Sequence, residues 1–237
     1  MQTISSAFFQ RKLILNLIFF DIDGTLLISQ GAGGRSITRV MKTTFQVKEE
    51  IARIEIHGQT DRGIATQLFS AHGVEDSDEN WSLFKSSYLA VLDDELVNSD
   101  GELLPGIPPL LDQLHSDERV ELALLTGNLE IGAFKKVKHF GVEKYFTWGG
   151  FGDRQRDRSD LAREAMQAAE QKVNLQKVDK IFVIGDTPND IRCGKAIDAI
   201  TVAVATGGHS AEQLAAHHPD HLFSDLSDTE QIADLLA

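Results

Sequence analysis

Apolar and polar positions divide most of the chain into two kinds of segment. Short apolar runs, typical of buried parallel strands, occur at residues 13–20, 120–125, 180–184 and 200–205, with weaker examples at 145–148 and 222–223. Segments with helical spacing separate them, at residues 109–116, 129–140, 160–172 and 190–197, and further helices are expected from Ser210 and Asp228. This alternation predicts an α/β fold with a doubly wound parallel sheet.

One region departs from the alternation. Between residues 29 and 104 the pattern predicts helices without a buried strand, at 36–45, 61–72, 80–92 and 93–98. A glycine-rich stretch, 31–34, borders this region on one side, and the turn-forming residues 104–109 border it on the other. We therefore expect a helical cap at residues 29–104, inserted into a core of residues 12–28 and 105–237 that follows an N-terminal tail, 1–11.

Composition narrows the set of partners. The 237 residues are 42% hydrophobic, which is enough for a sizeable core, and 36 acidic against 23 basic residues give a formal charge of -13. This charge argues against nucleic acid or an anionic membrane as a main partner. The single cysteine, Cys193, excludes an internal disulfide and suits a reducing cytosol, so we expect a cytoplasmic protein.

Two carboxylates stand directly after the first apolar run. Asp21 and Asp23 are separated by one residue and followed by Gly24 and Thr25. In an extended segment such side chains point the same way, at the strand end where open α/β sheets bind ligands. Two buried like charges need a neutralising cation, and Mg²⁺ takes carboxylate and phosphate oxygens. By itself, however, the pattern also fits an Asp-rich turn.

Three later strand ends and loops also carry polar groups. They are Thr126-Gly127-Asn128, the loop with Arg154, Arg156 and Arg158, and Gly185-Asp186 with Asp190 four residues after Asp186. Backbone donors at the start of the helix expected from 129 suit an anion. Taken separately, the first group also fits an ordinary turn, and the second a solvated charge cluster.

In this order, the four groups resemble the motifs of the haloacid dehalogenase-like hydrolase superfamily. The resemblance covers nearly the whole chain, and the helical insert after the first motif makes it closest to phosphoglycolate-phosphatase-like members. It implies an Mg²⁺-dependent phosphatase that hydrolyses a small phosphorylated metabolite through an aspartyl-phosphate intermediate. The oligomeric state, monomer or homodimer, stays open.

The chemistry of phosphate-ester hydrolysis suggests roles for the first two aspartates. A carboxylate can act as nucleophile, and Asp21, directly at the strand end, suits that role. Asp23 can protonate the leaving oxygen and later deprotonate water. The resemblance implies the same roles, and it makes Asp21, Asp186 and the backbone carbonyl of Asp23 metal ligands. Asp190 is then a further ligand or a support for the site.

The substrate-binding groups complete the expected site. Thr126, Gly127 and Asn128 should bind the phosphoryl group. The family usually supplies a lysine as well, but residues 149–170 contain none. We expect Arg158 in its place, because it directly precedes the expected helix cap Ser159 and can bind phosphate through two hydrogen bonds; Arg156 is the alternative.

The cap contributes one further candidate. The segment 57–62 resembles the family's cap segment that faces the active site, and it ends in Arg62. Arg62 should therefore bind a second anionic group of the substrate, unless it is an ordinary surface arginine in a first helical turn.

Three other functions use related residues. A phosphomutase of the β-phosphoglucomutase type would share every motif. A 2-haloacid dehalogenase would share the scaffold and Asp21, and a non-catalytic module could bind phosphometabolites on this fold. The presence of Asp23 and Asp186 argues against the dehalogenase and against the non-catalytic module.

Overall fold

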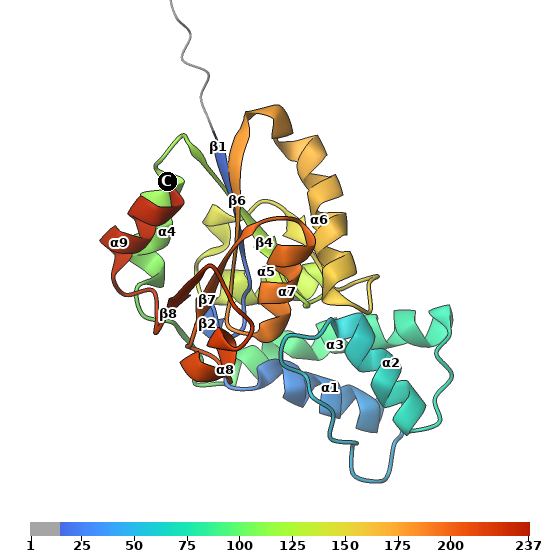
Figure 1. Cartoon of the computed structure of the whole chain (residues 1–237). Helices are drawn as coiled ribbons and strands as arrows, with labels where there is room; N and C mark the ends of the chain where they lie inside the picture. Colours follow the sequence, from blue (N-terminus) through green and yellow to red (C-terminus); the bar gives the residue numbers. More distant parts are fainter. Residues whose placement is uncertain (1–14) are drawn as a thin grey trace, which may run out of the picture.

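The centre of the molecule is a six-stranded parallel sheet. The structure, a computed structural model, describes residues 15–237; the expected tail at 1–11 lies outside them. In spatial order the strands are β5 (Gly149–Gly150), β4 (Val120–Leu125), β1 (Leu15–Phe20), β6 (Val178–Gly185), β7 (Ile200–Val204) and β8 (His221–Phe223). Every pairing is parallel. The predicted α/β class and parallel sheet are confirmed (Figure 1).

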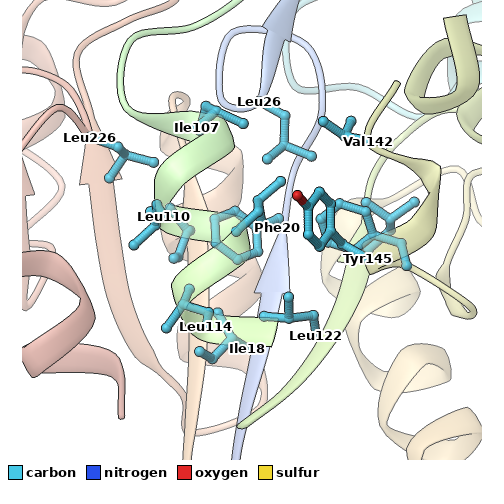
Figure 2. Close-up of a cluster of buried hydrophobic side chains, with 14 of the residues drawn as sticks. Ile18, Phe20, Leu26, Ile107, Leu110, Leu114, Leu122, Val142, Tyr145 and Leu226 are labelled. Carbon is cyan, nitrogen blue, oxygen red and sulfur yellow. The ribbon is translucent and has the colours of Figure 1, made fainter. Parts of the chain in front are cut away.

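Side chains of β1 alternate between two hydrophobic layers because successive residues of a strand point to opposite faces. On one face, Ile18 and Phe20 pack with α4 (Ile107–His115) (Figure 2). The same layer includes side chains of α5 (Glu130–His139) and α9 (Thr229–Leu236). Leu17 and Phe19 pack with α6 (Arg158–Lys172) and α7 (Pro188–Ala196) on the other. A short helix, α8 (Ala211–Ala215), packs through Leu214 beside β7. The sheet is thus covered on both faces, and polar groups can gather only at its edges and ends.

Three helices pack around a hydrophobic cluster of their own. They are α1 (Ala32–Thr43), α2 (Asp61–Ala71) and α3 (Asp78–Val97), and Figure 1 shows them together at one end of the sheet. The chain enters this region through β2 (Leu27–Ile28) and leaves through β3 (Glu102–Leu103), which pair antiparallel. We keep the name cap for residues 29–104; the boundaries of the two domains stay a prediction.

Several elements differ from their predicted form. The helices expected at 80–92 and 93–98 form one helix, α3. The prediction of a strand at 145–148 is wrong. A 3₁₀ turn covers Glu143–Tyr145, and the strand of this region, β5, lies at Gly149–Gly150. Tyr145 and Phe146 are apolar because they pack in the core, and not because they belong to a strand. The pair β2–β3 escaped prediction because two residues carry no readable alternation.

Within residues 15–237, no helix combines the length and the apolar composition required to cross a bilayer.

Candidate active site

A cavity of about 290 Å³ lies between the carboxyl ends of the central strands and the cap. Motif residues from β1, β4 and β6 form its core side, and side chains of the cap, among them Ile37, Ile64 and Tyr88, form the opposite side. Parallel strands bring their carboxyl ends to one edge of the sheet, so side chains far apart in sequence meet there.

Asp21 lies at the centre of this edge. Its Oδ1 accepts a hydrogen bond from Arg158 Nη2 at 3.1 Å, and the same nitrogen binds Asp190 Oδ1 at 2.5 Å. All three residues are buried. Burial is the largest influence on Asp21 and raises its pKa to about 6, although Arg158 acts in the opposite direction. Arg158 therefore stands against the carboxylate, as expected for the third motif.

Three buried carboxylates form a group that could hold a metal ion. Asp21, Asp186 and Asp190 each offer one oxygen, and these oxygens lie within 4.8 Å of one another. Burial first, and then the charges of Asp190 and Asp21, raise the pKa of Asp186 to about 8. With Arg158 included, the formal charge of the ionised group is -2, from three carboxylates and one guanidinium. Hard oxygen donors and this charge fit a divalent cation such as Mg²⁺.

Asp186 and Asp190 differ in how their carboxylates are held. Asp186 accepts one hydrogen bond, from Thr25 Oγ1 at 3.2 Å, and lies against Gly207, where a Cβ would come within 1.7 Å of its Oδ2. Asp190 Oδ2 accepts from the backbone and hydroxyl of Thr187, in the capping box of α7, while its Oδ1 binds Arg158. Asp186 thus has the freer oxygens, and Asp190 mainly orients Arg158.

The carboxylate of Asp23 points away from this group. Its Oδ2 accepts from Lys136 Nζ at 2.5 Å and Asn128 Nδ2 at 2.9 Å, and its Oδ1 accepts from Ser29 Oγ at 3.1 Å. Burial by itself would raise the pKa of Asp23, but Lys136 and these hydrogen bonds hold the pKa below its usual value. Asp23 is therefore held as a carboxylate that can accept a proton beside Asp21, while metal binding by its backbone carbonyl stays a prediction.

Thr126, Gly127 and Asn128 form the wall next to Asp23. Asn128 Nδ2 donates to Thr126 Oγ1 at 2.8 Å, and all three residues line the cavity. At Gly127 a Cβ would lie 1.9 Å from the carbonyl oxygen of Gln59 in the cap. A side chain at this position would therefore prevent the cap from lying against the core.

The cap is attached to this wall by the first turn of α2. The Asp61 backbone donates to the Gly127 carbonyl at 2.7 Å, and Asp61 Oδ2 accepts from the Leu129 backbone at 2.8 Å, just before α5. Burial raises the pKa of Asp61 to about 6. Sequence reasoning included Asp61 in the cap segment 57–62 but assigned it no role; its contacts depend on how the cap docks.

Arg62 is not brought to the cavity, so the structure does not support its expected substrate-binding role. Its guanidinium binds Asp76 Oδ1 at 2.6 Å and Thr66 Oγ1 at 2.7 Å and lies over Trp81. The first turn of α2 directs Asp61, and not Arg62, toward the cavity. Arg156 also binds Thr66 and Asp76, each at 3.0 Å, so Arg158 rather than Arg156 reaches Asp21.

The expected helix cap Ser159 and the single cysteine, Cys193, both lie next to Arg158. Ser159 is not the cap of α6: the helix begins at Arg158, and Asp157 accepts from the Ser159 backbone at 2.7 Å. Cys193 is fully buried, and burial raises its pKa to about 12, which leaves no thiolate for nucleophilic chemistry.

Lys136 and Tyr88 are cavity residues that sequence reasoning missed. Lys136 lies on α5 and is only 3% exposed, and Tyr88 lies on α3 and is 1% exposed. A lysine or tyrosine within an amphipathic helix carries no local signal of such a position. Only the packing of α3 and α5 around the cavity reveals them.

Known proteins share this fold and sequence pattern. The chain is 24% identical over 222 residues to the pyrophosphatase PpaX of Listeria monocytogenes serotype 4b, covering 90% of this chain and 94% of that protein. It is 24% identical over 230 residues to the phosphoglycolate phosphatase of Vibrio parahaemolyticus, covering 94% and 98%. The crystal structure of CbbY from Rhodobacter sphaeroides in complex with phosphate superposes with a TM-score of 0.68 at 16% identity, covering 91% of this chain and 96% of that one.

A family model gives the broader classification. The model described as haloacid dehalogenase-like hydrolase matches residues 15–198, which include Asp21, Thr126, Arg158 and Asp186. This match covers more than half of the chain. The resemblance noted from the motifs is confirmed, and the chain belongs to the haloacid dehalogenase-like hydrolases.

Proposed function

We propose that the protein is an Mg²⁺-dependent phosphatase that hydrolyses a phosphate monoester of a small metabolite through an aspartyl-phosphate on Asp21. The observation that carries the proposal is the position of the Asp21 carboxylate, which accepts a hydrogen bond from Arg158 and belongs to the acidic group at the cavity wall. Two relatives that match nearly the full chain are named as phosphatases, which supports the proposal.

In the first step, a carboxylate oxygen of Asp21 attacks phosphorus, and the bond from phosphorus to the leaving oxygen breaks. Arg158 and the hydroxyl of Thr126 bind the phosphoryl oxygens. Asp23 takes the proton of the monoanionic phosphate ester as the ester binds and passes it to the leaving oxygen. In the second step, Asp23 takes a proton from the water that attacks phosphorus and frees Asp21. When bound by Asp21, Asp186 and the carbonyl of Asp23, Mg²⁺ would supply charge neutralisation and orientation.

The cap has a part in this proposal. Residues 29–104 form a domain that opens on the β2–β3 pair to admit substrate and closes to exclude water. The two connections between cap and core run side by side in that pair, Leu27 opposite Leu103 and Ile28 opposite Glu102. A two-residue ribbon is short enough to bend without disturbing the main sheet.

Replacement of the nucleophile tests the proposal. Asp21→Asn should lower Mg²⁺-dependent phosphate release from a panel of small phosphate monoesters by more than about three orders of magnitude, since no carboxylate remains to attack phosphorus. The circular dichroism spectrum should not change. Asp179→Asn, at an exposed position in β6, is the matched control and should keep full activity.

Three results would contradict the proposal. Full activity of Asp21→Asn would exclude Asp21 as nucleophile, and activity that persists in EDTA would exclude the metal requirement. Formation of an isomeric phosphate ester without phosphate release would indicate a phosphomutase instead.

A further inference from the structure

The hydroxyl of Tyr88 faces the cavity without a partner. Tyr88 is 1% exposed, its ring packs parallel to that of Phe84, and it lines the cavity wall. Within residues 15–237, no group forms a hydrogen bond to this hydroxyl. Burial raises the pKa of Tyr88 well above its usual value, so the hydroxyl keeps its proton and can donate. Because Tyr88 lines the cavity, this hydroxyl is available to an acceptor on a ligand.

Lys136 offers a second donor close by. Its ammonium group carries three N–H donors, and two of them bind Asp23 Oδ2 at 2.5 Å and Asn128 Oδ1 at 2.7 Å. In the described part of the chain no third acceptor is bound. The remaining donor is therefore free for a ligand.

Both donors border the same small space, which exists because residue 33 is glycine. A Cβ built on Gly33 would lie 3.4 Å from Tyr88 Oη and 3.6 Å from Lys136 Nζ. An oxygen atom that packs against the open Cα of Gly33, beyond that point, could accept a hydrogen bond from each of them. Gly33, Tyr88 and Lys136 all line the cavity, and they come from three different helices, α1, α3 and α5.

The space lies on the side of the leaving group. Lys136 binds the oxygen of Asp23 that also binds Asn128, and Asp23 is the residue proposed to protonate the leaving oxygen. A substituent that extends from that oxygen past Asp23 toward Lys136 would enter the space. The side chains of the cap beside it, Ile37 and Ile64, are apolar, which makes Tyr88 and Lys136 its main polar contacts.

The charges around this space favour an uncharged substituent. The basic side chains that line the cavity are Lys136, Arg158 and His57. Each already contacts a carboxylate, that of Asp23, Asp21 and Glu55 respectively. Asp61, a further acid, lines the same cavity, whereas Arg62 and Arg156 are bound to Asp76 elsewhere. A second anionic group would therefore lack a free counterion.

We propose that Tyr88 and Lys136 form a subsite for an uncharged oxygen of the leaving group, so that the substrate is a small hydroxylated phosphate monoester rather than one with a second anionic group. This inference rests on the proposed phosphatase activity. It differs from what the names of the phosphoglycolate phosphatase and pyrophosphatase relatives suggest.

Three substrates that differ at one position test the subsite: ethyl phosphate, 2-hydroxyethyl phosphate and phosphoglycolate. The wild type should show the highest kcat/KM for 2-hydroxyethyl phosphate. Tyr88→Phe should lower that value by about three- to tenfold more than it lowers the value for ethyl phosphate, the effect of one neutral hydrogen bond. Tyr145→Phe is the matched control, because its hydroxyl binds Asp112 outside the cavity.

Gly33→Ala gives a second, independent variant. The added methyl group would meet its neighbours at ordinary contact distances, so the helix should fold while the space is filled. This variant should lose more kcat/KM on 2-hydroxyethyl phosphate than on methyl phosphate.

The outcomes separate the subsite from the activity itself. Equal losses on all substrates in Tyr88→Phe and Gly33→Ala, or a wild-type preference for phosphoglycolate, would overturn the subsite. Absence of turnover of every substrate by the wild type would instead refute the proposed phosphatase function.

Discussion

At the scale of single residues, Asp61 is an acid that the folded protein makes harder to ionise. Its carboxylate is buried at the cap–core contact and accepts one backbone hydrogen bond, from Leu129. Lys136 acts to lower the pKa, but burial acts more strongly and raises it from 3.8 to about 6. Between pH 3.8 and about pH 6, Asp61 is protonated to a greater extent in the folded state than in the unfolded state. The free energy of unfolding therefore falls as pH rises through this range.

Asp61→Asn should remove this dependence on pH. A change of pKa from 3.8 to about 6 corresponds to about 3 kcal/mol of unfolding free energy. The amide oxygen of asparagine can still accept from Leu129. When pH is raised from 4 to 7, the free energy of unfolding of the variant should therefore increase by up to about 3 kcal/mol relative to that of the wild type. Urea denaturation at each pH measures this difference.

Asp179→Asn is the control for this measurement, because Asp179 is exposed. The free energies of unfolding of Asp179→Asn and of the wild type should differ by the same amount at pH 4 and at pH 7. A constant difference for Asp61→Asn as well would mean that Asp61 ionises normally in the folded protein.

At the scale of elements, the arginine-rich loop before α6 serves two purposes. Arg158 reaches Asp21 inside the site, while Arg156 binds Thr66 on α2 and Asp76 just before α3. Arg156 is 57% exposed and Asp76 26% exposed, so this ion pair is worth at most about 1 kcal/mol. The loop nevertheless links the cap to the core directly beside Arg158.

Arg156→Gln should loosen the cap without affecting the sheet. The loss of a pair worth up to about 1 kcal/mol allows up to about fivefold more opening of the cap. Amide hydrogen exchange in α2 should rise by that factor at low salt and less at high salt, because the pair is screened. Exchange in β1 and β6 should stay the same.

Arg154→Gln in the same loop is the control, since Arg154 is 81% exposed and pairs with Glu164 on α6. It should leave α2 unchanged. Equal exchange in the wild type and Arg156→Gln would show that Arg156 does not hold the cap.

At the scale of the whole molecule, the acidic group at the sheet edge predicts that a cation stabilises the folded protein. Asp21, Asp186 and Asp190 are buried in a chain of formal charge -13, with one arginine among them. Their mutual repulsion is part of the free energy of the folded state. A cation that binds only the folded arrangement stabilises it by mass action.

Mg²⁺ should therefore raise the melting temperature of the wild type. At a concentration of about 100 times Kd the expected stabilisation is about 2.7 kcal/mol. Asp186→Asn should lose most of this effect, because Asp186 has the freer oxygens in the group. NaCl at equal ionic strength is the control, and an equal shift with both salts would argue against a specific site.

Site residues could be predicted from the sequence where the neighbouring residues along the chain define their position. Asp21, Asp23, Asp186 and the Thr126 motif could be identified because each directly follows an apolar strand, and parallel strands bring such ends together. The absence of lysine in residues 149–170 pointed to an arginine. Arg158 was preferred to Arg156 because it precedes the expected helix cap Ser159, although the cap is in fact Asp157. Lys136 could not be found in this way, since its partner Asp23 is 113 positions away and α5 resembles any amphipathic helix.

The sequence by itself determined the alternation of strand and helix, the helical insert after the first motif and the residue types needed for phosphoryl chemistry. These features depend on spacing along the chain, which burial and backbone geometry convert directly into strands, helices and their ends. Only the tertiary structure decided which side chains line the cavity. It turned Arg62 toward Asp76 and placed Asp61, Tyr88 and Lys136 against the site, because the docking of α2, α3 and α5 is set by contacts between distant segments.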